Sequence, residues 1–272
     1  MSCELGKSLQ GFSQLSKLRT LKVHLFWWSD AEECQNYVSA LLSSNLHHLY
    51  LTGGPLIMEK WYPPSPCIIR KLHIIGCYIR KVPNWMSSLG SLTELQLWIH
   101  RMGPNDIEIL GAIPSLCFLK LKTMCGINGR IIICSNKGFR SLTYFSLRIK
   151  RCGTLLEFEP ESMPKLDNFQ VEFRLHGMDC LNGASDFGIQ HLSALTKVKI
   201  GIWGNICSDG IYDPEQDMNN SITRSVVSLI KAAIEKLPNH PTSRFHLEYD
   251  HGRCLLVSSR PDLETLIVNS SS

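Results

Sequence analysis

Residues 91–98 read SLTELQLW, and residues 115–122 repeat the same arrangement of apolar positions as SLCFLKLK. In each stretch the apolar residues follow the spacing L-x-x-L-x-L, which begins at Leu92 and again at Leu116. Successive side chains of a β-strand point to opposite faces, so the last two leucines share one face and the residue between them lies on the other. Each stretch therefore predicts a short strand with one buried face and one exposed face.

The same spacing, with close apolar substitutes for leucine, occurs eight times along the chain. Successive copies are 28, 23, 23, 24, 26, 24 and 29 residues apart, which is the period of leucine-rich repeats, roughly 20–29 residues. One repeat cannot bury its own leucines, so neighbouring repeats stack around a common core. We therefore expect an α/β leucine-rich-repeat solenoid, a horseshoe with a parallel sheet on its concave side and irregular or helical convex segments. The middle apolar residues of the copies are Leu21, Leu49, Leu72, Leu95, Leu119, Phe145, Phe169 and Val198.

The segments between the predicted strands must return along the convex side, and two of them carry local signals. Residues 29–32, Ser-Asp-Ala-Glu, form a capping box that predicts a helix over residues 31–44, with Val38, Leu41 and Leu42 on its apolar face. Residues 77–83 form a short segment that ends in Pro83, which predicts an irregular or 3₁₀ turn.

The period stops after residue 205. We expect residues 1–205 to hold the repeats, residues 206–250 to hold a loop, a capping helix and a last strand, and residues 251–272 to form a tail of uncertain structure. The helix is predicted over 221–237 because its apolar residues form one stripe, which includes Leu229 and Ile230 and ends before Pro238. Such a stripe is typical of a helix that seals the end of a solenoid, and the alternative is a helix that binds a partner.

Composition excludes several classes of protein. Of 272 residues, 44% are hydrophobic and 19% charged, which is typical of a folded chain. The net charge of +4 is too small to indicate nucleic-acid binding. None of the 11 cysteines forms a CxxC pair, and the sequence shows neither a signal peptide nor a long apolar span. We therefore expect reduced thiols, no transmembrane span and a cytoplasmic location.

Motifs for catalysis are missing from the sequence. It contains no GxSxG, HExxH, GxGxxG or GxxxxGK[ST] segment. His240, His246 and His251 recur close together, but their spacing fits no zinc site. We expect no enzymatic activity, no bound metal and no cofactor.

Several segments of the chain resemble one family, the coiled-coil nucleotide-binding leucine-rich-repeat (NLR) disease resistance proteins of plants, especially cereals. The resemblance is to the leucine-rich-repeat region of these proteins. The segment 72–86 is similar to that family's cytosolic repeat, with Cys77 and the Val82-Pro83-x-Trp85 step. The segment 106–116, which contains Leu110-Gly111-x-Ile113-Pro114, is similar to the phrase that follows it. Further similar stretches are residues 156–158, 163–166, 188–192 and 238–241, so the resemblance covers roughly residues 12–250.

The resemblance implies a recognition and autoinhibition module of an intracellular immune receptor. Its partner would be a pathogen effector, a host target or an upstream nucleotide-binding domain. Because the coiled-coil region, the phosphate-binding loop and the Met-His-Asp motif of the family are missing here, we expect either part of a longer receptor or a truncated product.

The residues that alternate with the strand leucines are the candidates for partner binding, because they form the largest continuous surface of such an array. They are mostly basic and include aromatic residues, and Tyr, Trp and Arg supply many hot spots in protein interfaces. We expect a protein partner with an acidic face, and the alternative is that these side chains are only solvated. The candidates are Lys22, Tyr50, Lys71, His73, Gln96, Trp98, Lys120, Lys122, Tyr144, Arg148, Lys197 and Lys199.

Three other functions remain open from the sequence. A free-standing adaptor, such as the substrate-recognition part of a ubiquitin ligase, also uses leucine-rich repeats. A cell-surface receptor would require a signal peptide, paired capping cysteines and many glycosylation sites. An inactive fragment of an NLR is the third alternative.

Overall fold

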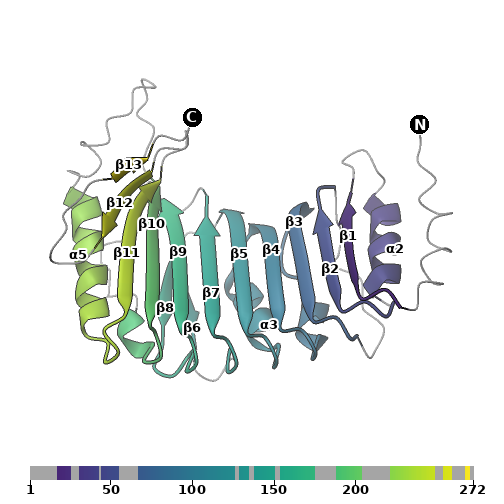
Figure 1. Cartoon of the computed structure of the whole chain (residues 1–272), viewed down its shortest axis with the longest axis horizontal. Helices are drawn as coiled ribbons and strands as arrows, with labels where there is room; N and C mark the ends of the chain where they lie inside the picture. The colour runs from purple at the N-terminus through teal and green to yellow at the C-terminus, as the bar shows by residue number, and fades with distance from the viewer. Residues whose placement is uncertain are drawn as a thin grey trace.

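The computed structural model describes residues 17–25, 31–42, 44–54, 67–125, 129–134, 138–150, 154–174, 188–203, 221–248, 254–258 and 267–269. Their main feature is an eleven-stranded sheet in which neighbouring strands follow one another along the chain. Figure 1 shows these strands side by side along the long axis of the molecule, with helix α2 near one end and helix α5 at the other. The parallel strands are β1 (Thr20–His24), β2 (His48–Thr52), β3 (Lys71–Ile79), β4 (Glu94–Arg101), β5 (Phe118–Cys125), β7 (Tyr144–Ile149), β9 (Asn168–Arg174), β10 (Lys197–Trp203) and β11 (Thr242–Glu248).

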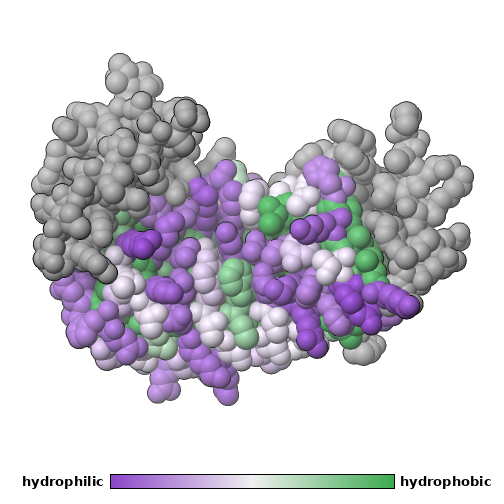
Figure 2. All heavy atoms as spheres, in the orientation of Figure 1, coloured by the Kyte–Doolittle hydropathy of each residue, from purple (hydrophilic) through white to green (hydrophobic). Residues whose placement is uncertain are grey.

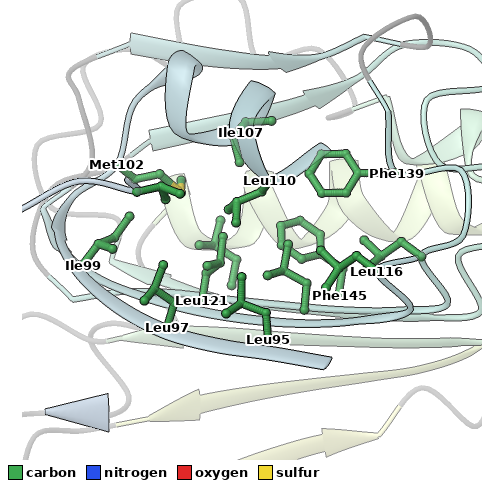
Figure 3. Close-up of a cluster of buried hydrophobic side chains, with 14 of the residues drawn as sticks. Leu95, Leu97, Ile99, Met102, Ile107, Leu110, Leu116, Leu121, Phe139 and Phe145 are labelled. Carbon is green, nitrogen blue, oxygen red and sulfur yellow. The ribbon is translucent and has the colours of Figure 1, made fainter. Parts of the chain in front are cut away.

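The register of the sheet places the repeats in line and confirms the predicted solenoid. The middle apolar residues of the eight repeats pair in succession, from Leu21 in β1 to Val198 in β10. From β2 to β10 each of them is at most 2% exposed, whereas Leu21 in the edge strand is partly buried. The core is therefore one continuous layer behind the sheet. Figure 3 shows part of it, where Leu97 of β4 and Leu110 of helix α3 (Pro104–Gly111) lie in one cluster with Phe139.

A row of backbone hydrogen bonds fixes the spacing between repeats at the start of the strands. The carbonyl oxygen of Arg70 accepts from the N–H groups of Thr93 at 2.8 Å and Glu94 at 3.0 Å. The hydroxyl of Thr93 donates to the same oxygen at 3.1 Å. This paired arrangement, here called the carbonyl ladder, recurs at the carbonyl oxygens of Arg19, His47, Arg70, Thr93, Cys117, Thr143 and Asp167.

The segments that return between strands differ from one repeat to the next. Helix α2 (Ala31–Leu42) confirms the predicted helix with an end at Leu42, and its predicted capping residues 29–30 lie outside the described residues. The predicted irregular turn over residues 77–83 was wrong at its start, because residues 77–79 extend strand β3; the 3₁₀ turn η1 (Asn84–Ser88) begins only after Pro83. Two features were not predicted: helix α3, and a parallel pair formed by β6 (Gly129–Ile133) and β8 (Thr154–Phe158). A short 3₁₀ turn, η4 (Ile189–His191), precedes β10.

Helix α3 is tied to the preceding turn by a buried carboxylate. Asp106 is 3% exposed, and its two oxygens accept from the N–H groups of Val82 and Gly103, each at 2.7 Å. Burial raises the pKa of Asp106, although these two hydrogen bonds act in the opposite direction. Sequence reasoning missed this helix although its start carries local signals, Pro104 in the first turn and Asp106 three positions after Gly103.

The C-terminal region continues the sheet beyond the regular period. Helix α5 (Ser221–Glu235) buries Val226, Ile230 and Ala233, as its apolar stripe predicts. The inclusion of Leu229 in that stripe was wrong, since Leu229 is 38% exposed. Successive residues of a helix are turned by about 100° around its axis, so Leu229 and Ile230 lie on opposite sides of Val226. Leu229 is on the side that reaches the rim of the buried face.

Strand β11 follows helix α5, where a last strand was expected, and pairs in parallel with β10 as the ninth parallel strand. Two shorter strands complete the described sheet: β12 (Cys254–Ser258) and β13 (Ile267–Asn269). Each of them runs antiparallel to its neighbour, unlike the nine strands before them.

Candidate protein-binding surface

Three rows of side chains form the face of the sheet that the returning segments leave uncovered, which we call the open face. It corresponds to the face predicted to be concave. The middle row runs through Lys22, Tyr50, His73, Gln96, Lys120, Ser146, Gln170 and Lys199, each paired with the next. All twelve candidate residues of the sequence analysis fall on the three rows. Lys71, Tyr144 and Lys197 lie in the row before the middle one, and Trp98, Lys122 and Arg148 lie in the row after it.

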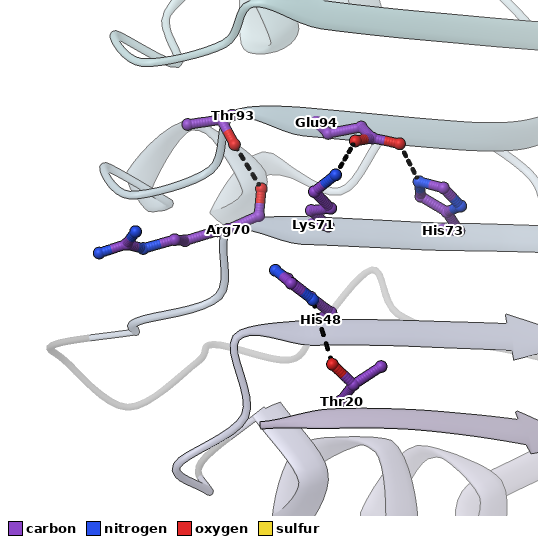
Figure 4. Close-up of polar contacts among 7 residues, drawn as sticks. All are labelled: Thr20, His48, Arg70, Lys71, His73, Thr93 and Glu94. Atoms are coloured by element: carbon purple, nitrogen blue, oxygen red, sulfur yellow. Dashed lines mark hydrogen bonds and ion pairs between the residues drawn. The ribbon is translucent and has the colours of Figure 1, made fainter. Parts of the chain in front are cut away.

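A carboxylate joins the positive side chains near the N-terminal end of the open face. Glu94 accepts from Lys71 Nζ at 2.7 Å and from His73 Nε2 at 2.7 Å (Figure 4). Because a carboxylate only accepts, the proton of His73 in this contact lies on Nε2. The ring of His73 also meets Tyr50 edge to face, with ring centres 4.6 Å apart. The basic character expected here is therefore neutralised by Glu94.

The titration of this group reflects the balance between burial and ion pairing. Burial opposes ionisation of Glu94, but the hydrogen bonds from Lys71 and His73 outweigh it and lower the pKa of the carboxyl. Burial lowers the pKa of His73, which is 8% exposed, in spite of its bond to Glu94. The hydrogen bond to Glu94 raises the pKa of Lys71. Glu94 is thus ionised at neutral pH and holds both partners in place.

Aromatic rings and cations alternate at the centre of the open face. Lys122 Nζ lies 3.6 Å from the centre of the Trp98 ring, which is a close cation–π contact. Two rows away, on the other side of the middle row, Phe118 stacks on Tyr144 with ring centres 4.2 Å apart and an angle of 5° between the planes. Burial, followed by the nearby Lys150 and Arg148, lowers the pKa of Lys122 to about 8.

The C-terminal part of the open face holds a second ion pair. Arg148 Nε lies 2.9 Å from an oxygen of Glu172, across adjacent strands. Glu172 and His246 approach each other over Gly201. A Cβ at that position would lie 2.7 Å from Glu172 Cγ and 2.8 Å from His246 Nε2, so glycine is required for this close approach. Lys197 and Lys199 lie on the neighbouring strand β10.

Sequence reasoning missed Glu94 and Phe118 as members of this surface. Both precede the middle-row residue of their repeats by two positions, so the alternation that found Lys71 and Tyr144 would also have found them. The alternation does not show which residues Glu94 and Phe118 contact, because those residues lie on neighbouring repeats.

Other sites for ligands on the described residues are few. Within the described part of the chain, no group of three or more His, Cys, Asp and Glu residues could hold a metal ion. None of the helices in that part is both long and apolar enough to cross a membrane. A cavity of about 620 Å³ lies between helix α3 and the segment at 138–141, lined by residues such as Glu108 and Arg140.

The aligned repeats, their continuous core and their open face define a leucine-rich-repeat solenoid. A family model described as a leucine-rich repeat region matches residues 2–243, and the chain belongs to this family. The chain is also similar to disease resistance protein RGA5 of rice, Oryza sativa subsp. japonica, with 26% identity over 211 residues. That match covers 72% of this chain and spans 18% of the length of RGA5. The predicted resemblance to the repeat region of plant disease resistance proteins is confirmed.

Proposed function

We propose that this chain is the recognition module of a plant intracellular immune receptor of the NLR class. It binds a protein partner on the open face of the sheet: a pathogen effector, a host protein or the receptor's own nucleotide-binding domain. The module performs no catalysis, and it works in the cytoplasm. The similarity to a rice disease resistance protein supports the proposal that the chain belongs to a plant immune receptor.

The observation that carries this proposal is the composition of the open face. Trp98 on β4 and Arg148 on β7 lie in the row after the middle one, and Tyr144 on β7 lies in the row before it. Each is held by a cation–π contact, an ion pair or a stacking contact. These residue types dominate the binding energy of protein interfaces when they are held in place before binding. Among the described residues, the parallel strands follow one another in the sheet from β1 to β11 without an interruption.

Recognition by such a module acts through differential binding. A receptor alternates between a closed state, in which the repeats hold the nucleotide-binding domain inactive, and a released state. A partner that binds the released state more tightly shifts the population toward it, by no more than the difference between its two binding free energies. The repeats supply the binding surface, and the rest of the receptor supplies the signal.

Photo-crosslinking in plant cells tests the proposed surface. The full chain is expressed with a benzophenone amino acid in place of Gln96, in the middle row, or in place of Asn105, which is exposed on helix α3. We expect covalent adducts with the same plant or pathogen protein from Gln96 and from a second middle-row position, Lys120, and few from Asn105. Equal adducts from Asn105, or none from the three rows, would contradict the proposal.

A further inference from the structure

The centre of the open face contains a compact group that the function proposed above does not explain by itself. Trp98 of β4 pairs with Lys122 of β5, and Phe118 of β5 pairs with Tyr144 of β7. Lys120 lies between these two pairs on β5. These five residues, here called the mid-sheet patch, span three adjacent strands, which is about 10 Å across the sheet. The patch therefore has the width of a short peptide segment.

Positive charge in this region is crowded. Lys122 is half-buried, and three nearby cations disfavour its positive charge. They are Lys120 on the same strand, and Arg148 and Lys150 at the end of β7. Glu172 attracts it from β9, but that carboxylate is already paired with Arg148. Among the described residues, no carboxylate lies within ion-pair distance of Lys120 or Lys122. A bound anion would reduce the repulsion between these cations. It would also offset the hydration that the Lys122 ammonium group loses through its partial burial.

The aromatic members of the patch add a second requirement. Trp98 shields one side of Lys122, and the stacked Phe118 and Tyr144 rings lie two rows away, beyond Lys120; all three aromatic residues are partly exposed. Figure 2 shows polar and apolar side chains interspersed over this view of the molecule. A ligand that fits the patch therefore carries an anionic group next to an apolar one.

The surroundings of the patch distinguish a short anionic ligand from a long one. Glu94 precedes the patch on β4, and Glu172 follows it on β9. Each of these carboxylates is paired with a cation, so the charge next to the patch is already compensated. A polyanion such as a nucleic acid would therefore gain few further ion pairs beside the patch, whereas a peptide with one or two acidic residues needs only Lys120 and Lys122.

We propose that the mid-sheet patch binds a short acidic segment of the protein partner, with its carboxylates at Lys120 and Lys122 and a neighbouring aromatic or aliphatic side chain against Phe118 and Tyr144. This inference rests on the proposed function, since it assumes that the open face binds a protein. It adds the chemistry of the partner and the part of the face that selects it.

A binding experiment with defined peptides tests the inference. The probe is a fluorescein-labelled peptide of sequence GSGFDELSG, which carries two acidic residues between a phenylalanine and a leucine, and its control, GSGFNQLSG, has Asn and Gln in place of Asp and Glu. Fluorescence anisotropy with the full chain should show binding of the acidic peptide and at least about tenfold weaker binding of the amide control. Lys122→Gln should weaken binding of the acidic peptide about tenfold, and Lys122→Arg should weaken its binding less.

A matched variant separates the patch from the general charge of the face. Lys199→Gln removes one positive charge from the middle row of β10, and it should change the affinity less than about twofold. A thermal melt of each variant verifies that the chain remains folded. Trp98→Leu should weaken the acidic peptide as well, because it removes the ring that positions Lys122.

Several results would overturn the inference. They are equal losses from Lys122→Gln and Lys199→Gln, equal binding of the amide peptide, no binding of the acidic peptide at millimolar concentration, and tighter binding of an oligothymidine of similar length. The crosslinking result from Gln96 is independent of these outcomes. Adducts there together with a failed peptide test would leave the open face as the binding surface and remove only the mid-sheet patch.

Discussion

Single residues on the open face are held by contacts that depend on their charge, and Glu94 is the clearest case. It is the common partner of Lys71 and His73, so replacing it leaves a buried imidazole and a lysine without their acceptor. The sequence shows a glutamate at this position, but it does not show which residues pair with it. They lie on the preceding strand, and only the register of the sheet brings them together.

Replacing Glu94 with Gln should lower the free energy of unfolding by about 1 kcal/mol at pH 7. The pKa of Glu94 is lowered in the folded chain, so its ionised form contributes stability above the unfolded value of about 4.3, and this contribution is lost as pH falls through the lower folded value. The difference between Glu94→Gln and the native chain should therefore become smaller as the pH is lowered from 7 to 3. Urea unfolding at both pH values measures it.

The matched control for this prediction is Glu235→Gln, an exposed carboxylate in helix α5. It should change stability by less than about 0.5 kcal/mol at either pH. A pH-independent effect of Glu94→Gln would show that the side chain acts through packing rather than through its charge.

Whole elements differ in how well their sequence determines them. The strands were predictable because each repeats one spacing of leucines, and helix α5 was predictable because 15 residues carry a strong apolar stripe. Helix α3 and the β6–β8 pair were not predicted. They are only eight and five residues long, and their apolar positions become ordered only against the core of the repeats.

Two substitutions in helix α5 distinguish its buried side from its rim. Ile230 is 1% exposed, so Ile230→Asp places a charge in the core and should lower the free energy of unfolding by about 3 kcal/mol or more. Leu229→Asp, at the 38% exposed neighbour, should cost less than about 1 kcal/mol. Differential scanning fluorimetry of both variants compares their melting temperatures. Equal shifts would mean that the helix does not pack on the array through the Ile230 side.

At the scale of the whole molecule, each repeat contacts chiefly its neighbours. Stability in such an array is close to a sum of repeat and interface contributions. The repeat period alone predicted this architecture and its continuous core. It did not predict the ninth parallel strand at full length, because β11 follows β10 only after the long insertion that contains helix α5.

The position of a substitution along the array should therefore determine its effect. Leu119→Ala, at a fully buried site in a central repeat, should lower the free energy of unfolding by about 3 kcal/mol, because it leaves a cavity between two neighbours. Leu21→Ala, at the partly buried edge, should cost about 1 kcal/mol. Urea unfolding gives the two values, and hydrogen exchange shows which strands open. Similar costs at both positions would contradict the nearest-neighbour picture.

The carbonyl ladder has a consequence for how such a chain can diversify. One carbonyl oxygen per repeat receives both N–H groups at the start of the next strand, whether the step between repeats is 23 or 29 residues. An insertion or deletion in a returning segment therefore leaves the spacing of the strands unchanged. Residues of the open face can then be exchanged one at a time on a constant frame. Substitutions on the open face and changes in loop length can therefore accumulate independently of each other, without a new fold.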